Sequence, residues 1–167
     1  MLHREKLTVR CRYLVRSDMP AVLVAESIGY PDHGLSEEDF LYTLRQRNCL
    51  GVVAESCDQV LGHMLYEIWR SRIHLITLAV HPDFQRRGVG AQLLSKLTHK
   101  LSAHRRTQIS TIVHEGSLGG QLFLHRHGFR ATKVLCGRMD DGCDGYVMRY
   151  ALAGVEDESE IESEVGF

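Results

Sequence analysis

The chain has 167 residues, a formal net charge of −1, and 44% apolar and 25% charged residues. These values suit one globular domain with a core of its own and exclude a wholly disordered chain. No apolar run approaches the roughly 20 residues of a membrane span, and the N-terminus lacks the apolar region of a secretory signal. The five cysteines form no C-x-x-C pair, so we expect a reduced, cytoplasmic protein.

The charge is distributed unevenly along the chain. Residues 153–167 carry six acidic residues and no Lys or Arg, which leaves the remainder basic. A tail of this composition is typical of a solvated, disordered end, and it can also screen a basic face. We therefore expect a single domain over residues 1–152 and a disordered acidic tail over 153–167.

Hydrophobic periodicity and turn residues predict the elements of the first half in chain order. They are a strand over 7–14, a helix from 17 or 18 to about 27, a turn-rich loop over 29–34, a helix that follows the capping box at 36–39, and a hairpin of strands 49–55 and 60–69.

The second half continues with a strand over 73–80, a helix from 88 to about 103, a strand over 108–113, a helix over 117–126, and strands over 129–137 and 146–152. The order is β α α β β β α β α β β. Antiparallel hairpins that precede a βαβ crossover indicate an α+β fold with a mixed central sheet of about seven strands and about four flanking helices. On the helix at 117–126 we expect Leu118, Leu122 and Phe123 to face the core.

One stretch stands out at the start of the helix near residue 88, where Gln85-Arg86-Arg87-Gly88-Val89-Gly90 separates an apolar strand end from an apolar-periodic segment. Glycines let a backbone approach a ligand, and the free amides of a helix N-terminus bind anions. Two arginines add cationic donors. The same glycines also suit a plain strand-to-helix turn. The stretch lacks the Lys-Ser/Thr of a Walker loop and the third glycine of a dinucleotide-binding turn, so ATP and NAD are poor candidates.

The segment LAVHPDFQRRGVGAQLL, residues 78–94, resembles the acetyl-CoA-binding motif of the GNAT acetyltransferase superfamily, (Gln/Arg)-x-x-Gly-x-(Gly/Ala). Gln85, Gly88 and Gly90 fill the pattern, and the element order as far as Tyr150 is similar to that of the GNAT fold. The stretch DGCDGYVM from Asp141 resembles the last hairpin of the branch that includes the ribosomal-protein-alanine N-acetyltransferases.

This resemblance implies a coenzyme A site. Backbone groups of Leu78 and Val80 should pair with the pantetheine arm as an added strand would, and the Val80 amide should polarise the thioester carbonyl. Amides from Arg86 to Ala91 should hold the diphosphate, while the two arginine side chains either reach the phosphates or only line the surface. The implied cofactor-binding residues are Leu78, Ala79, Val80, Gln85, Arg86, Arg87, Gly88, Val89, Gly90, Ala91 and Ser117.

The catalytic pattern of the branch is incomplete. Ile112 stands where the resemblance implies a Glu base, and Leu124 where it implies a Tyr acid. Three alternatives follow: another group is the base, water relays the proton, or the protein binds acyl-CoA with little turnover. His114 and Glu115 are the candidate catalytic residues, because strand alternation puts His114 on the face of Ile112 and its ordinary pKa suits a base. His114 can equally be a surface histidine at a strand end.

For the acceptor, the resemblance places Tyr30 and the hairpin residues Arg138 and Met139 at the substrate site; Tyr30 can equally be a plain loop aromatic. It implies transfer of acetyl to a primary amine, foremost a protein N-terminal α-amine, with a small-molecule amine or a weakly active acyl-CoA-binding module as alternatives. We expect no metal, because His125 and His127 lack further ligands at suitable spacing. We also expect no membrane or direct nucleic-acid partner, and a monomer or homodimer.

Overall fold

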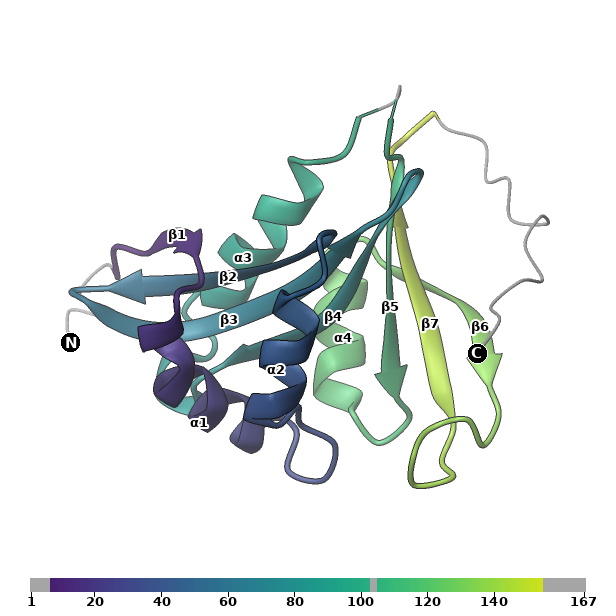
Figure 1. Cartoon of the computed structure of the whole chain (residues 1–167). Helices are drawn as coiled ribbons and strands as arrows, with labels where there is room; N and C mark the ends of the chain where they lie inside the picture. The colour runs from purple at the N-terminus through teal and green to yellow at the C-terminus, as the bar shows by residue number, and fades with distance from the viewer. Residues whose placement is uncertain (1–6, 103–104, 155–167) are drawn as a thin grey trace, which may run out of the picture.

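The computed structural model describes residues 7–102 and 105–154 and has a seven-stranded sheet with two helices on each face (Figure 1). In chain order the elements are β1 (Arg10–Tyr13), the 3-10 turn η1 (Arg16–Asp18), α1 (Met19–Gly29), α2 (Glu37–Leu44), β2 (Cys49–Ser56), β3 (Gln59–Ile68), β4 (Arg72–Val80), the 3-10 turn η2 (Pro82–Phe84), α3 (Val89–Thr98), β5 (Gln108–His114), α4 (Leu118–Arg126), β6 (Arg130–Leu135) and β7 (Gly145–Ala151). This order confirms the predicted α+β fold.

The strands lie in the order β1-β2-β3-β4-β5-β7-β6. All neighbours are antiparallel except β4 and β5, which are parallel. A parallel pair needs a long crossover, and α3 provides it. The chain therefore leaves the end of β4, crosses one face of the sheet as α3, and returns as β5.

Strand alternation divides the core into two layers. Val52 and Ala54 of β2 face α3 and α4, where they pack with Leu93 and Phe129 among others. Val53, between them, faces the opposite side and packs with Met19, Val22 and Phe40 of α1 and α2, as well as Leu65 of β3. Because successive strand residues point to opposite faces, one hydrophobic run in β2 fills both layers.

Several boundaries differ from the sequence prediction. Helix α3 ends at Thr98 rather than near residue 103, because Lys100 and Leu101 form short turns with Leu97 and Thr98 instead of continuing the helix. Strand β1 begins at Arg10 rather than at residue 7, since its pairing with β2 starts there. The acidic tail lies outside the described residues apart from its first two positions, so its predicted disorder and the domain limits stay predictions.

The prediction for the buried face of α4 was wrong at two positions. Leu118 and Leu122 are 62% and 48% exposed, whereas Leu124 is buried and Phe123 packs at the edge of the core. Leu118 and Leu122, four residues apart, share the outer side of the helix, and the sheet is contacted by the side that carries Leu124. None of the helices in the described part of the chain is long and apolar enough to cross a membrane.

Candidate active site

The two parallel strands separate soon after they begin to pair. Within the described chain, the β4–β5 ladder joins Arg72, Ile73 and His74 to their partners and extends no further. His81 donates its N–H to Leu61 of β3, so alternation directs the backbone groups of Leu78 and Val80 away from β3 and toward the gap. The edge of β4 thus leaves peptide groups unpaired with β5, and the pairing of this edge with a pantetheine arm stays a prediction.

The turn after β4 is shaped by two residues in the left-handed region. Arg86 has φ +59°, which is uncommon for a residue with a Cβ, and Gly88, the N-cap of α3, has φ +84°. A Cβ at Gly88 would have no atom within 4 Å, so the space in front of the helix is open. The first helical hydrogen bond runs from Gln92 N–H to Gly88, which leaves the preceding amides free for an anion.

Other residues of the predicted cofactor motif have distinct positions. The Gln85 side chain donates to Val80 O at 3.0 Å and fastens the turn to the end of β4. Gly90 lies against the Phe123 ring, 3.2 Å from where its Cβ would be, so it allows α4 to approach α3. Arg86 and Arg87 are exposed, and the Arg87 guanidinium lies 5.8 Å from the Phe84 ring centroid. These positions fit a diphosphate held mainly by backbone amides.

A hollow of about 200 Å³ lies between the diverging strands. Ile112 and Leu124, which occupy the positions of the absent Glu and Tyr, both line it, as do Tyr30, Met139 and Ser117. The Tyr30 hydroxyl donates to Leu78 O at 2.9 Å. The hollow therefore brings together two of the predicted acceptor residues, Tyr30 and Met139, with Leu78 and Ser117 of the predicted cofactor set. Arg138 and the residues of the turn from Gln85 to Ala91 are not among those that line it.

A buried carboxylate that sequence reasoning missed lies at the inner end of this hollow. Glu26 of α1 is 2% exposed and accepts hydrogen bonds from His63 Nε2 at 2.9 Å, Thr77 Oγ1 at 2.9 Å and Leu35 N–H at 3.1 Å. Three donors compensate for the removal of the carboxylate from water. The sequence offers one signal for this buried carboxylate, namely a single acidic residue within a largely apolar helix.

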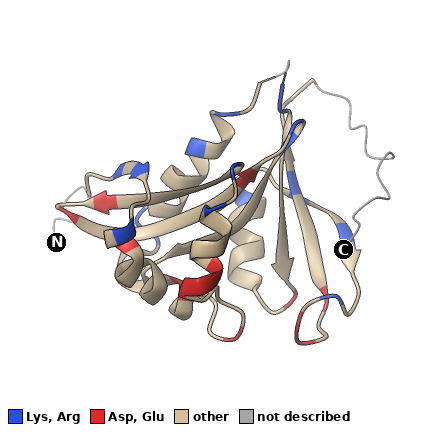
Figure 2. Cartoon of the chain, in the orientation of Figure 1, with Lys and Arg blue, Asp and Glu red and all other residues tan. Residues whose placement is uncertain are grey.

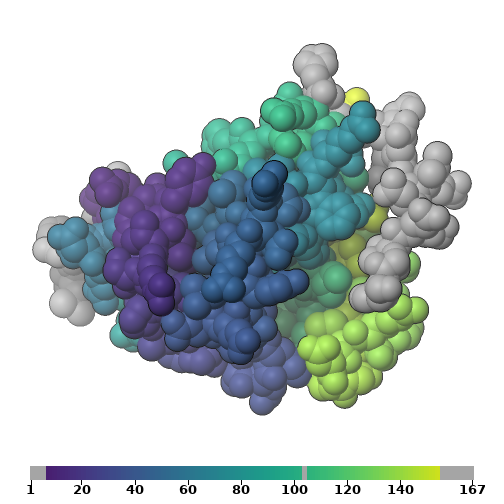
Figure 3. All heavy atoms as spheres, in the orientation of Figure 1, coloured from purple at the N-terminus to yellow at the C-terminus, as the bar shows by residue number. Residues whose placement is uncertain are grey.

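The opening of the hollow is bridged by three side chains from distant segments. His114 at the end of β5 lies 2.8 Å from Asp141, measured from Nε2 to Oδ2, and His33 of the α1–α2 loop lies 3.3 Å from the same oxygen. The two imidazole rings stack with centroids 4.8 Å apart. Figure 3 shows the α1–α2 loop and the β6–β7 hairpin meeting at the lower edge of the molecule.

Both ring nitrogens of His114 have partners. The Gly116 N–H donates to Nδ1 at 2.9 Å, so the ring proton is on Nε2 and is donated to Asp141. The N–H of Cys143, and next the hydrogen bond from His114, hold the pKa of Asp141 far below its ordinary value. Asp141 is therefore ionised and joins the hairpin to β5.

The ligand atoms of His33, His114 and Asp141 lie within 4.8 Å of one another, which raises the question of a metal. The two Nε2 atoms each approach one carboxylate oxygen, Oδ2 of Asp141, at 3.3 and 2.8 Å. Moreover, Nδ1 of His114 accepts a hydrogen bond, and metal-bound histidines ordinarily donate from the second nitrogen. This geometry fits a shared carboxylate better than a metal centre.

Glu115 and Ser117 lie beside this opening. The Glu115 carboxylate accepts from the Asp144 N–H at 3.3 Å, and its own N–H donates to Asp144 O, so it ties the hairpin base to β5. Ser117 is the N-cap of α4, with its hydroxyl close to Gly120. The coenzyme A contact that the resemblance implies for Ser117 and the candidate catalytic role of Glu115 therefore stay predictions.

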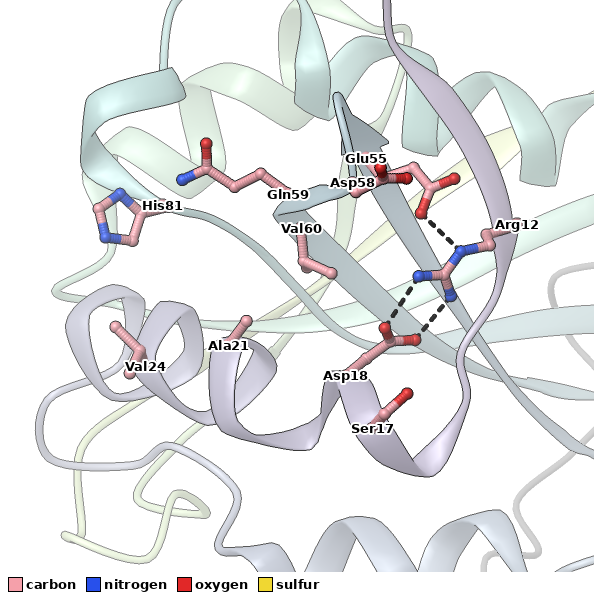
Figure 4. A pocket seen from close by; sticks show the side chains of 10 residues that line it. All are labelled: Arg12, Ser17, Asp18, Ala21, Val24, Glu55, Asp58, Gln59, Val60 and His81. Carbon is pink, nitrogen blue, oxygen red and sulfur yellow. Dashed lines mark hydrogen bonds and ion pairs between the residues drawn. The ribbon is translucent and has the colours of Figure 1, made fainter.

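A second, larger hollow of about 590 Å³ lies between the start of α1 and the β2–β3 turn (Figure 4). Arg12 donates to both oxygens of Asp18, at 2.7 and 2.9 Å, and its Nε donates to Glu55 at 2.6 Å. One guanidinium thus pairs with two carboxylates from different elements, and Arg10 donates to Glu55 as a second cation. We assign these charges to holding β1, α1 and β2 together rather than to binding.

Comparison with known proteins identifies the family of the chain. A family model described as "Acetyltransferase (GNAT) domain" matches residues 13–152. The chain belongs to the GNAT acetyltransferase family. It is therefore an N-acetyltransferase with acetyl-CoA as cosubstrate, and the open β4 edge and the free amides beside Gly88 fit that molecule.

Solved GNAT structures share this fold at low identity. Ard1 from Thermoplasma volcanium has a TM-score of 0.76 and 18% identity, covering 86% of this chain and 97% of that one. The ribosomal-protein-S18-alanine N-acetyltransferase from Escherichia coli has a TM-score of 0.74 and 18% identity, and the match covers 92% of this chain and 100% of that one. NAA60 from Arabidopsis thaliana, in complex with a bisubstrate analogue, has a TM-score of 0.74 and 15% identity, and the match covers 89% of this chain and 100% of that one. A search of curated proteins found no significant match.

Proposed function

We propose that this GNAT enzyme acetylates the α-amine of a protein N-terminus. The observation that carries the proposal is the hollow between β4 and β5, which is lined by Leu78 on the edge of β4, by Tyr30 of the α1–α2 loop and by Met139 of the β6–β7 hairpin. An acceptor that enters from the α1–α2 loop would meet the thioester where Val80 offers its amide. The similar structures of the alanine N-acetyltransferase and of NAA60 with a bisubstrate analogue support an acceptor of this kind.

Charge around the opening supports an amine acceptor. Acidic residues gather on the loops along the lower edge of the molecule (Figure 2). They come from four segments that surround the opening: Asp32 in the α1–α2 loop, Glu37, Glu38 and Asp39 in the first turn of α2, Glu115 after β5, and Asp140, Asp141 and Asp144 in the β6–β7 hairpin. Such a rim attracts ammonium groups and raises their local concentration.

The main contribution of the residues of this chain would be to bind and orient the two reactants. Backbone groups of Leu78 and Val80 would hold the pantetheine arm, and the amides from Arg86 to Ala91 the diphosphate. A free α-amine has a pKa of about 7.7–8.0, so a useful fraction is neutral near pH 7. Positioning this amine against the thioester supplies a large part of the rate, and the Val80 amide stabilises the charge that forms on the carbonyl oxygen.

Two routes are proposed for the proton that the amine loses. In the first, His114 accepts it at Nδ1 after the Gly116 N–H releases that atom. In the second, water at the opening carries it away and His114 only positions Asp141. Glu115, fastened to the hairpin, would then act through the same water. The profile of kcat/KM for His114→Ala from pH 6 to 9 separates the routes, because only the first predicts that the variant loses the part of the rise on the acidic side that depends on a neutral imidazole.

A steady-state assay with acetyl-CoA tests the proposed acceptor. Short peptides with a free α-amine are compared with the same peptides blocked at the N-terminus but carrying Lys, and with small polyamines. Acetylation of the free-N-terminus peptides alone is expected. Preference for polyamines would assign a small-molecule acceptor, and tight coenzyme A binding without any product would indicate a binding module. The cytoplasmic location and the monomeric or homodimeric state stay predictions.

A further inference from the structure

The family resemblance implies a tyrosine on α4 at the position of Leu124, where this chain has no hydroxyl. The phenol of Tyr30, from the α1–α2 loop, lines the same hollow. We propose that the hydroxyl of Tyr30 donates a hydrogen bond to the sulfur of coenzyme A as it leaves, and so acts as a catalytic residue. This inference rests on the proposed acetyl transfer. It assigns to Tyr30 a role beyond the pocket wall expected from the sequence.

The position of the Tyr30 hydroxyl supports this role. It lies 2.9 Å from Leu78 O, on the edge of β4 that faces the gap, and Val80 N–H is two residues, about 6.6 Å of strand, further along the same edge. The thioester carbonyl at Val80 and the sulfur one bond away from its carbon therefore come within reach of the phenol. No other tyrosine is among the described residues that line the hollow.

The phenol is free to change partner when the cofactor is bound. In this structure it donates to Leu78 O. The pantetheine arm, paired with the β4 edge, would place an amide donor on that carbonyl, because added strands satisfy backbone carbonyls in this way. The carbonyl would then be shared between two donors, and the sulfur, which develops negative charge as the bond breaks, becomes the stronger acceptor for the hydroxyl.

The backbone around Tyr30 is fixed on both sides. Its N–H donates to Glu26 O at 2.8 Å, and its carbonyl accepts from Gly34 N–H at 2.9 Å. A Cβ on Gly34 would lie 2.8 Å from that carbonyl, so the loop closes tightly on it. Burial raises the pKa of Tyr30, which keeps the hydroxyl protonated and able to donate throughout the neutral range.

The other polar side chains on the hollow are less suited to the sulfur. The Nε2 atoms of His33 and His114 face Asp141, and the Thr77 hydroxyl donates to Glu26. Ser117 lies at the start of α4, next to Gly120. Thr111, on β5, also lines the hollow. Tyr30 is the residue whose hydroxyl is seen to donate to the edge of β4 that faces the gap.

The proposed step keeps atoms and electrons balanced. The amine nitrogen forms a bond to the acetyl carbon while the carbon–sulfur bond breaks and its electron pair goes to sulfur. Tyr30 stabilises the thiolate by hydrogen bonding and keeps its own proton, because a buried phenol is a weaker acid than a thiol. The nitrogen releases one proton through His114 or water, and the sulfur takes one up from solvent as coenzyme A leaves.

The test titrates the thiol of bound coenzyme A by its ultraviolet thiolate absorbance, which needs no acceptor. Tyr30→Phe is compared with the wild type and with Tyr42→Phe, a matched control on α2 whose side chain is 66% exposed. In Tyr30→Phe the pKa of the bound thiol should rise by about one unit or more, with Kd for coenzyme A within about threefold of wild type. For an acceptor found in the steady-state assay, kcat should fall about 10- to 100-fold. Tyr42→Phe should match the wild type in each measurement.

An unchanged thiol pKa in Tyr30→Phe would overturn the inference even if acetylation is normal. Conversely, an altered thiol pKa in a protein that acetylates no amine would uphold the contact with sulfur and refute the proposed acceptor. Absence of coenzyme A binding in the wild type would overturn both. Circular dichroism of the variant, with melting near the wild-type temperature, shows that any change is local to the hydroxyl.

Discussion

Replacement of Gly88 by alanine separates the conformational role of this residue from its role in holding an anion. At φ +84° a side chain is strained, and left-handed alanine costs about 1–2 kcal/mol. The new Cβ meets no atom of the chain within 4 Å, so no packing term is added. For a chain of this size the expected fall in Tm is about 2–8 °C. Gly154→Ala is the matched control, since Gly154 has the same φ of +84° and equally open surroundings.

The two variants should differ in cofactor affinity. The added methyl group at Gly88 would occupy the space in front of the free helix amides and weaken one charge-assisted hydrogen bond, a loss of about 1.5–3 kcal/mol. This corresponds to a Kd for coenzyme A raised about 10- to 150-fold by calorimetry, against no change for Gly154→Ala. An unchanged Kd in Gly88→Ala, or an equal loss in both variants, would refute the assignment of these amides to the diphosphate.

Three further variants test the framework of the site by urea unfolding. Gly62→Ala puts a Cβ 2.7 Å from Ala79 O, so β3 and β4 must shift, and we expect a loss of about 1–3 kcal/mol; full stability would contradict the tight packing. Glu26→Ala leaves three donors unpaired and should cost at least about 3 kcal/mol, whereas a smaller cost would indicate water in their place. The hydrogen bond from Arg12 holds the pKa of Asp18 below its ordinary value. The stabilisation by Asp18 is therefore complete at neutral pH. It is lost as the pH falls below the unfolded-state pKa of about 4 and then through the lower pKa of Asp18 in the folded protein. Asp18→Asn should be less stable than wild type at pH 7 and approach it at pH 3; a constant difference would exclude this linkage.

The features that the sequence predicted correctly are those set by local patterns. The element order follows from alternation in β2 to β4 and from the apolar face of α3, where Val89, Leu93, Leu94 and Leu97 are all buried. The strand-to-helix turn could be located because the glycine at position 88 reflects a backbone constraint, a φ of +84° at the N-cap of α3. Such signals are contained within one element or one turn, so neighbouring residues suffice to read them.

The features that were missed depend on contacts between distant segments. Glu26 and His63 are 37 residues apart, and His114 and Asp141 are 27 apart, so no local period relates them. The outward position of Leu118 and Leu122 depends on which side of α4 meets the sheet, and two leucines one turn apart suit either side. The Tyr30 hydroxyl reaches Leu78 only because the α1–α2 loop folds back over β4.

The separation of β4 and β5 has a consequence for the energetics of the whole domain. The sheet is incompletely paired at its middle rather than at its rim, and this gap is where we propose that the cosubstrate binds. In each turnover the pantetheine arm would bind between β4 and β5 as an added strand does, and it would be released with the product. Saturation with coenzyme A should therefore slow amide hydrogen exchange on β4 and β5 together, because one bound molecule would contact both strands.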